Sequence, residues 1–539
     1  MTAMTFQLLG GIGLFLLGMV LLTDGLKAFA GEALQQALAR FTGTPAKAFA
    51  SGTLVTLMVQ SSSATTVTLI GFVSAGLITF PQAVGVVMGA SLGTTGTGWM
   101  VAVLGLKVSL GFYALPLVGV GALLRLLARG RWRAFGLALA GFGLIFVGIE
   151  TLQSGMQALA GAFDLARLPA AGPLGYLAAM AIGIVMTVVM QSSSAAMATT
   201  LTALHAQVLG FDQAAALAIG AAVGTTVTGA LAAIGGSVPA KRTAAAHVLF
   251  NLATGVIAIV LLPLLLWTVS VAQRHAGVEP GAVSLALFHT LFIALGVVLF
   301  LPFAEPLARL IERLLPESGL RLTRHLDDSL LHAPAVALEA TRRTLVEATV
   351  ESIDLLDPLL ASGAGAVDPA RRAELLTAFD RAQRFFARIP PISEDEPMSR
   401  SRVAQLHAID HLSRLLPRVD PPAALRRELA QPALRPAAEQ CRQVLALARA
   451  GLLGRSGGGW LGQVEQRALA LAQLRQRERL DVLRRTAAGA RNPNEALLSL
   501  DAIRWLERVT NHTWRACHYL ASDEAPPADA PDSPEAAGD

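Results

Sequence analysis

Two short polar runs interrupt long apolar stretches of the chain, and both read Gln-Ser-Ser-Ser-Ala. Three consecutive serines on an unbroken helix point about 100° apart and cannot converge on one ligand. If the chain turns there, hydroxyls and freed backbone amides gather at a helix start, which suits an anion. Freed carbonyl and hydroxyl oxygens suit Na⁺. The polar residues of the two runs are Gln60, Ser61, Ser62 and Ser63, and Gln191, Ser192, Ser193 and Ser194.

The two polar runs belong to a duplicated segment. The second run follows the first by 131 positions, and at that offset the stretch GASLGTTGT (89–97) becomes GAAVGTTVT (220–228). Upstream, eight residues recur 130 positions later, namely Gly13, Leu14, Gly18, Leu22, Gly25, Ala28, Ala30 and Gly31. Three blocks in one order, with the spacing kept to one residue, indicate an internal duplication. Each copy therefore has its own Gly-Thr-Thr element, with Thr94 and Thr95 in the first and Thr225 and Thr226 in the second.

Helix packing is the competing explanation for the polar runs. Small polar residues let membrane helices approach closely and form hydrogen bonds across their interface. One serine run would fit that role as well as a binding role. Two runs in register, each followed by Gly-Thr-Thr, favour binding. Irregular backbone at membrane depth persists only where it is buried or lines a polar cavity. We therefore predict that two broken hairpins build one site near the middle of the membrane.

Composition divides the chain into two parts of different kind. Hydrophobic residues make up 53% of the sequence and charged residues only 15%, against about 25% charged in an ordinary soluble domain. Residues 1–305 hold 12 of the 43 Lys and Arg and 7 of the 38 Asp and Glu, so the remainder holds 31 of each. We expect an all-α polytopic membrane domain followed by a soluble helical bundle. The excess bases flank apolar segments, so no nucleic acid is expected as a partner.

Charge placement predicts how the apolar segments cross the membrane. The positive-inside rule places the arginine-rich loop 125–133 in the cytoplasm. If the two segments with polar runs are re-entrant hairpins and the others cross, each copy contributes three crossings and one hairpin. The second copy is then inverted, as in many secondary transporters. The N-terminus lies outside and the soluble domain in the cytoplasm. The apolar segments fall at about 6–29, 48–73, 77–105, 108–128, 134–161, 173–209, 211–237, 242–271 and 282–304.

The domain boundaries follow from the same patterns. Amphipathic helices with a 3.6-residue period replace the apolar segments in the second half. The last residues are acidic and lack large apolar side chains, which is typical of disorder. The two cysteines, Cys441 and Cys517, form neither a disulfide framework nor a zinc-binding spacing, so we expect them to be reduced. We expect a transport domain at 1–305 (repeat 1 at about 5–130, repeat 2 at about 135–271, an extra helix at about 282–304), a linker at 306–334, a bundle at 335–521 and a disordered tail at 522–539.

The doubled QSSS runs, the Gly-Thr-Thr elements and AHVLFN (246–251) resemble the sodium–phosphate cotransporter family, its type II group and bacterial members. The second half resembles the PhoU-like helical domain often fused to bacterial members. The resemblance implies Na⁺-coupled movement of inorganic phosphate across the cell inner membrane, with phosphate, Na⁺ and the lipid bilayer as partners. It implies that both QSSS runs, the Gly-Thr-Thr threonines and Asn251 contact phosphate or Na⁺. A homodimer is left open.

Several residues depart from the pattern or invite another interpretation. HTLFI (289–293) resembles a second His-x-x-Phe-Asn element, but Ile293 stands at the asparagine position, which puts a polar role near His289 in doubt. His247 is at least as well explained by packing as by titration. Glu150 lies deep in an apolar segment, where an acid is a functional candidate, but a wet cavity near the helix end explains it equally well.

The soluble half offers weak metal-ligand spacings. Glu347 and Glu351 lie four residues apart on one helix, where we expect a solvated face, and Glu507 has only Asn511 at that spacing. His407 and His411 share the spacing but lack the glutamate of a zinc hydrolase motif. We therefore expect no metal site beyond Na⁺, no cofactor, and no enzyme, since no nucleophile–base pair or nucleotide loop is present.

The sequence leaves two other functions open. A phosphate exporter or an uncoupled phosphate pathway would use the same fold, because sequence does not set the direction of transport. A membrane regulator of phosphate signalling would use the helical bundle to signal and the membrane part only to sense. Phosphate flux through purified protein separates the regulator from the two transporters.

Overall fold

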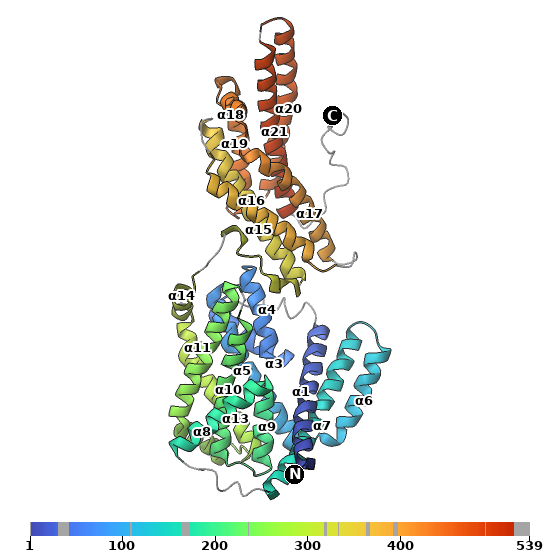
Figure 1. The fold of residues 1–539 in the computed structure, drawn as a ribbon, viewed down its shortest axis with the longest axis vertical. Coiled ribbons are helices and arrows are strands. Elements are labelled where there is room, and N and C mark those ends of the chain that lie inside the picture. Colours follow the sequence, from blue (N-terminus) through green and yellow to red (C-terminus); the bar gives the residue numbers. More distant parts are fainter. Residues whose placement is uncertain are drawn as a thin grey trace. The chain divides into compact units, whose positions relative to one another are not determined.

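The chain forms two compact units, residues 1–318 and 319–539. Within the part that the structure describes, every regular element is a helix (Figure 1). The structure is a computed structural model, and it describes residues 2–30, 43–107, 110–162, 172–234, 237–316, 321–332, 334–362, 367–391, 397–490 and 492–521.

The described residues of unit 1 include seven helices that are long and apolar enough to cross a membrane. Unit 1 is therefore a multi-pass membrane domain, as the sequence predicts. Its helices are α1 (Thr2–Ala30), α3 (Pro45–Val59), α4 (Ser62–Ser74), α5 (Phe80–Trp99), the π-helical η1 (Met100–Lys107), α6 (Gly111–Leu127), α7 (Arg131–Ala162), α8 (Pro173–Met190), α9 (Ser193–His205), α10 (Phe211–Ala232), α11 (Val238–Val260), α12 (Leu262–His275), α13 (Ala282–Phe300), the 3-10 turn η3 (Leu301–Phe303) and α14 (Ala304–Leu314).

Three of the predicted apolar segments are broken in the structure. The two that carry polar runs divide into α3 and α4, and into α8 and α9. The segment at 242–271 divides at Leu261, because Pro263 fits only the first turn of a new helix. α8 has 18 residues, so by length and composition it is one of the seven candidate spans, whereas the 17-residue α6 falls just short of that length.

Matching glycines join α3 to α5 and α8 to α10. A Cβ on Gly89 would lie 2.1 Å from the Phe49 carbonyl oxygen, and one on Gly220 would lie 2.0 Å from the Met180 carbonyl oxygen. Glycine alone allows backbones to approach this closely. Gly220 follows Gly89 by 131 positions, and Met180 follows Phe49 by the same number. The duplication is therefore also seen in the helix packing.

The paired helices run in the same direction. A Cβ on Gly85 would meet Pro45, and one on Gly93 would meet Thr56, so the contacts advance together along α3 and α5. The matching contacts of α8 and α10 follow the same order. Because α3 and α5 begin at the same end, α4 must carry the chain back between them. The same argument makes α9 return between α8 and α10.

α1 and α7, the matching first helices of the two copies, pack against each other in opposite directions. Residue numbers fall along α7 as they rise along α1. The contacts also come in equivalent pairs: Gly11 of the first copy contacts Leu152 of the second, and Gly141, which is equivalent to Gly11, contacts Leu22, which is equivalent to Leu152. Self-complementary contacts of this kind arise from a local two-fold axis. The contacts are Gly11 with Leu152, Gly141 with Leu22, Gly25 with Ala138, and Gly155 with Leu8.

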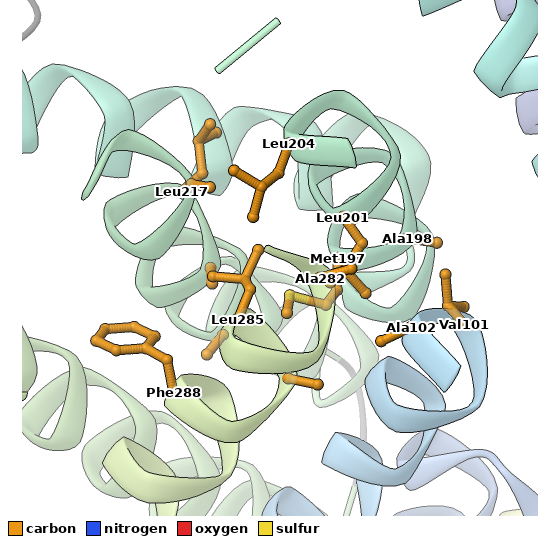
Figure 2. Close-up of a cluster of buried hydrophobic side chains, with 14 of the residues drawn as sticks. Val101, Ala102, Met197, Ala198, Leu201, Leu204, Leu217, Ala282, Leu285 and Phe288 are labelled. Carbon is orange, nitrogen blue, oxygen red and sulfur yellow. The ribbon is translucent and has the colours of Figure 1, made fainter. Parts of the chain in front are cut away.

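An apolar core joins the helix that follows the second polar run to helices of both copies. Figure 2 shows Val101 and Ala102 of η1 near Ala198 and Leu201 of α9. Leu285 of α13 belongs to the same cluster. Van der Waals packing of these side chains helps to hold α9 in place, because lipid supplies no hydrophobic force between membrane helices.

Unit 2 is the helical bundle that the amphipathic pattern predicts. Its last helix buries Ile503, Leu506, Val509 and Cys517 along one face. The amphipathic pattern of 422–450 predicts one helix, but the structure divides it into α18 and α19 with η7 between them, because proline cannot continue a helix interior. The helices are α15 (Pro334–Ser362), α16 (Pro369–Arg388), α17 (Pro397–Leu415), α18 (Ala423–Leu429), α19 (Arg435–Leu452), α20 (Trp460–Ala487) and α21 (Pro493–Ala521), with 3-10 turns η4 (Arg321–Thr323), η5 (Asp328–His332), η6 (Leu416–Val419) and η7 (Pro432–Leu434).

The stretch expected as a linker, 306–334, has regular structure in both units. Most of α14 lies in it and belongs to unit 1, where Arg242 donates to the Leu315 carbonyl at 2.9 Å. The turns η4 and η5 lie in it too and belong to unit 2. The boundary between the units falls at Ser318. The predicted acidic tail, 522–539, lies outside the described residues.

Candidate functional site

Each polar run breaks a helix at its glutamine. Gln60 (φ 57°, ψ 30°) and Gln191 (φ 51°, ψ 24°) are left-handed, a conformation that is uncommon for residues other than glycine. The side-chain amide of Gln60 donates to the Leu57 carbonyl at 2.6 Å, and that of Gln191 donates to Val188 in the same way. The glutamine side chain therefore satisfies a carbonyl that the ending helix leaves free.

The first serine of each run caps the helix that follows. The Ser61 hydroxyl accepts from the Ala64 backbone N–H at 3.2 Å, and the Ser192 hydroxyl accepts from the Ala195 N–H at the same distance. The remaining serines open the first turns of α4 and α9. Two helix N-termini, with their partial positive charge, thus begin at the polar runs.

A cavity of about 590 Å³, which we name the large cavity, brings the two runs together. All eight polar residues predicted from the two runs line it, from Gln60 to Ser63 and from Gln191 to Ser194. Thr225 of the second Gly-Thr-Thr element lines it too. The sequence placed these residues 131 positions apart, and the fold brings them around one space.

A second, small cavity of about 20 Å³ shares lining residues with the large cavity. Ser62 and Ser193, the matching serines of the two runs, line both cavities. The small cavity is also lined by the predicted residues Thr94, Thr225 and Asn251. Its volume is about that needed for a single water molecule. Ser62 and Ser193 therefore border both a space large enough for an oxyanion and one that fits a single water-sized group.

Two predicted site residues line neither cavity. The Thr95 hydroxyl donates to the Leu92 carbonyl of its own helix at 2.8 Å. Thr226 is buried. Each Gly-Thr-Thr element therefore presents one threonine to the cavities, and a binding role for Thr95 and Thr226 stays a prediction.

Thr97, which sequence reasoning did not select, connects the two runs. Its hydroxyl donates to Gln60 Oε1 at 2.9 Å and accepts from Ser194 Oγ at 3.5 Å. Thr228, its equivalent in the second copy, lines the large cavity. Both threonines end the repeated nine-residue blocks, so the signal was present in the sequence as GTTGT and GTTVT.

The predicted Asn251 is held at the small cavity by two hydrogen bonds. Its side-chain nitrogen donates to the His247 carbonyl at 3.0 Å and to Ser91 Oγ at 3.4 Å. His247 lines both cavities. His289 lines the small cavity with Ile293, and its buried Nδ1 has no hydrogen-bond partner among the described residues. The asparagine-to-isoleucine departure noted in the sequence therefore leaves an apolar group beside that histidine.

The other candidates lie away from these cavities. Glu150 is exposed, close to Gly111 at the start of α6, and lines neither cavity. His407 stacks on Tyr519, and His411 Nδ1 lies 3.3 Å from His512 Nδ1. No group of three or more metal-ligating side chains occurs in the part of the chain that the structure describes.

The expectation of a solvated face at Glu347 and Glu351 is wrong. Glu351 is 4% exposed and pairs with Arg321 and Arg371, at 2.6 Å and 2.7 Å. Glu347 pairs with Arg324 and with His325. The carboxylates are folded against arginines of the bundle, because a buried acid persists only with a charged or hydrogen-bonded partner.

Comparison with known proteins decides the family of unit 1. The sequence model of the Na⁺/Pi-cotransporter family matches residues 14–154 and then residues 148–305, more than half of the chain. The chain belongs to the Na⁺/Pi-cotransporter family. The same family model matches two consecutive stretches, in agreement with the duplication of the polar runs. Both matches end within unit 1, so the likeness of unit 2 to PhoU-like domains stays a prediction.

Relatives of this Na⁺/Pi-cotransporter family member occur in bacteria. An uncharacterized protein, YqeW of Bacillus subtilis, is 34% identical over 308 residues, which are 56% of this chain and 95% of YqeW. YjbB of Escherichia coli, provisionally named an inorganic phosphate export protein, is 29% identical over 63% of this chain and 62% of its own length. The chain thus spans less than two thirds of YjbB. No solved structure matches the chain.

Proposed function

We propose that this member of the family is a secondary transporter that moves inorganic phosphate across the membrane with Na⁺ as the coupling ion. The observation that carries the proposal is the large cavity, which is lined by every polar residue of both QSSS runs. Two helix N-termini and a set of hydroxyls favour an oxyanion. Hydroxyl and carbonyl oxygens favour Na⁺. Neither polar run contains an acid that could carry a proton in place of Na⁺.

The helix directions support an inverted arrangement of the two copies. α1 and α7 are matching helices that pack in opposite directions, with contacts related by a local two-fold axis. Inverted repeats let one central site face either side of the membrane in turn. We further propose that the α3–α4 and α8–α9 hairpins are re-entrant and act as the two gates.

Sodium dependence is tested by phosphate flux through purified protein in proteoliposomes. We expect ³²P-phosphate uptake to follow an imposed Na⁺ gradient and to stop when choline replaces Na⁺ at fixed pH. Equal uptake in choline would remove the coupling ion from the proposal. Absence of any flux in Na⁺ or choline would instead favour a regulatory membrane protein.

Export is the second candidate, and the provisional name of YjbB favours it. Both directions use the same site, so the cavity does not choose between them. Loading proteoliposomes with ³²P-phosphate and imposing the Na⁺ gradient in either direction separates them. Coupled uptake requires phosphate to follow Na⁺ to the same side, whereas an exporter without coupling releases phosphate down its own gradient regardless of Na⁺.

A further inference from the structure

One wall of the large cavity is a face of α1 that becomes charged toward the end of that helix. Leu16, Met19 and Val20 line the cavity first, and Asp24 and Lys27 line it last. From Leu16 to Lys27 the helix rises about 16 Å. The wall therefore changes from apolar to charged along its length, with the charges near the point where α1 ends.

These two residues bring the only fixed charges to the lining of the large cavity, among the described residues. The other lining groups are hydroxyls, amides, apolar side chains and His247. Asp24 is exposed and Lys27 is half-buried. Within the part of the chain that the structure describes, neither side chain has a hydrogen-bond or ion-pair partner. Among the described residues, nothing therefore neutralises the two charges that face the cavity.

The charges are present in one copy only. The positions equivalent to Asp24 and Lys27, 130 residues later on α7, are Ser154 and Gln157. Neither of these lines a described cavity. Helix packing, which is repeated in both copies, therefore does not require the two charges. Charged residues within a membrane segment are costly and are retained where they serve an ion pathway.

We propose that Lys27 and Asp24 form a vestibule site for ions, in which the Lys27 ammonium attracts phosphate and the Asp24 carboxylate attracts Na⁺ before either reaches the QSSS runs. The inference rests on the proposed function and adds its route of access. A cleft lined by charge of one sign raises the local concentration of its counter-ion by about 10-fold or more. Because Lys27 and Asp24 have opposite charges and lie on one helix, we take about 10-fold as the upper bound for each. The QSSS runs, which carry no charge, would bind the ions only after this step.

The test is ³²P-phosphate exchange in proteoliposomes with equal phosphate on both sides, so that the orientation of the protein does not matter. For Lys27→Gln we expect the KM for phosphate to rise by up to about 10-fold with little change in the maximal rate. Lys27→Arg should restore the KM, because it restores the charge. Asp24→Asn should raise the Na⁺ concentration needed for half-maximal exchange and leave the KM for phosphate less affected.

Lys241→Gln is the matched control, because Lys241 is exposed and does not line the cavity although Ala240 does. Raising the ionic strength from 0.1 M to 1 M, where the Debye length falls from about 10 Å to about 3 Å, should reduce the difference between wild type and Lys27→Gln. An unchanged KM in Lys27→Gln, with wild-type exchange intact, overturns the vestibule site alone. Absence of exchange in the wild type overturns the proposed function as well.

Discussion

The hydroxyl of Thr97 accepts a hydrogen bond from Ser194 Oγ at 3.5 Å, across 97 positions of sequence. The same hydroxyl donates to Gln60 Oε1 at 2.9 Å. One threonine of the first copy thus touches a polar-run residue of each copy. Thr97 therefore links the two polar runs through hydrogen bonds.

Thr97→Val removes this link and keeps the shape of the side chain. We expect the KM for phosphate to rise by about 2- to 10-fold, since each neutral hydrogen bond contributes about 0.5–1.5 kcal/mol. ³²P-phosphate exchange measures the change. Thr199→Val is the control, because the buried Thr199 hydroxyl bonds only to the Ala195 carbonyl of its own helix and lines neither cavity. Equal KM values in the two variants would argue against the link.

The glycine contacts predict matched losses of stability. Alanine at Gly89 or Gly220 would place a Cβ 2.1 Å or 2.0 Å from a carbonyl oxygen of the neighbouring helix. We expect each variant to lose at least about 1–3 kcal/mol, the usual cost of overpacking, and to show a lower midpoint of thermal unfolding in detergent. Gly13→Ala has no atom within 4 Å of the new Cβ and should not lower the midpoint. A large effect from only one of Gly89 and Gly220 would contradict the equivalence of the copies.

Membrane topology is tested by labelling introduced cysteines from each side. Arg131 donates to the Phe29 carbonyl at 3.2 Å, so the start of α7 lies at the end of α1. Cysteines at Ala3 and Arg129 should therefore be labelled from opposite sides, with position 129 in the cytoplasm. The native Cys441 and Cys517 are buried, which keeps background labelling low. Labelling of both positions from one side would refute the predicted crossing of α1.

The bundle of unit 2 should lose stability in mild acid. Burial, together with nearby arginines, lowers the pKa of His411 to about 4 and that of His512 to about 3; Arg414 contributes at both histidines and Arg418 at His512. At His411, Arg515 also lowers the pKa and Asp410 raises it. At His512, Arg508 also lowers the pKa. The folded state therefore binds fewer protons than the unfolded state, in which histidine has a pKa of about 6.5.

Stability should thus be complete above about pH 6.5 and should fall as the pH drops toward about 4, by at most about 1.4 kcal/mol per pH unit for each histidine. Hydrogen exchange of α17 and α21 in the whole protein, followed from pH 7 to pH 4, measures the loss. His512→Gln should flatten the dependence. An unchanged pH dependence in that variant would show that other groups cause it.

The sequence predicted features that depend on local pattern. The break at each QSSS run, the duplication and the amphipathic helices all follow from residue types within one segment. Features that depend on tertiary contacts were missed. Thr97 became a site residue only because α5 passes beside both runs, and Glu351 is buried because Arg321 and Arg371 come to it from other segments.

The charged vestibule was missed for a related reason. Asp24 and Lys27 lie at the end of an apolar helix, where a sequence pattern indicates only a membrane boundary. Their place on the cavity wall depends on how α1 packs beside the two polar runs. The proline breaks at Pro263 and Pro432, in contrast, could have been predicted from the sequence, because proline restricts the helix at its own position.

The central claim is that the two QSSS runs form one site. Ser62→Ala and Ser193→Ala test it most directly, since both serines line both cavities and each change removes one hydroxyl. A hydrogen bond to a charged ligand contributes about 1.5–3 kcal/mol, which is roughly 10- to 150-fold in affinity. Equilibrium binding of ³²P-phosphate and of Na⁺ to the purified variants should show a loss of at least 10-fold for phosphate or Na⁺ in each variant. Ser154→Ala, which alters a serine away from both cavities, should bind normally. Normal affinity in both Ser62→Ala and Ser193→Ala, with a lowered unfolding midpoint, would contradict the account and assign the serines to helix packing.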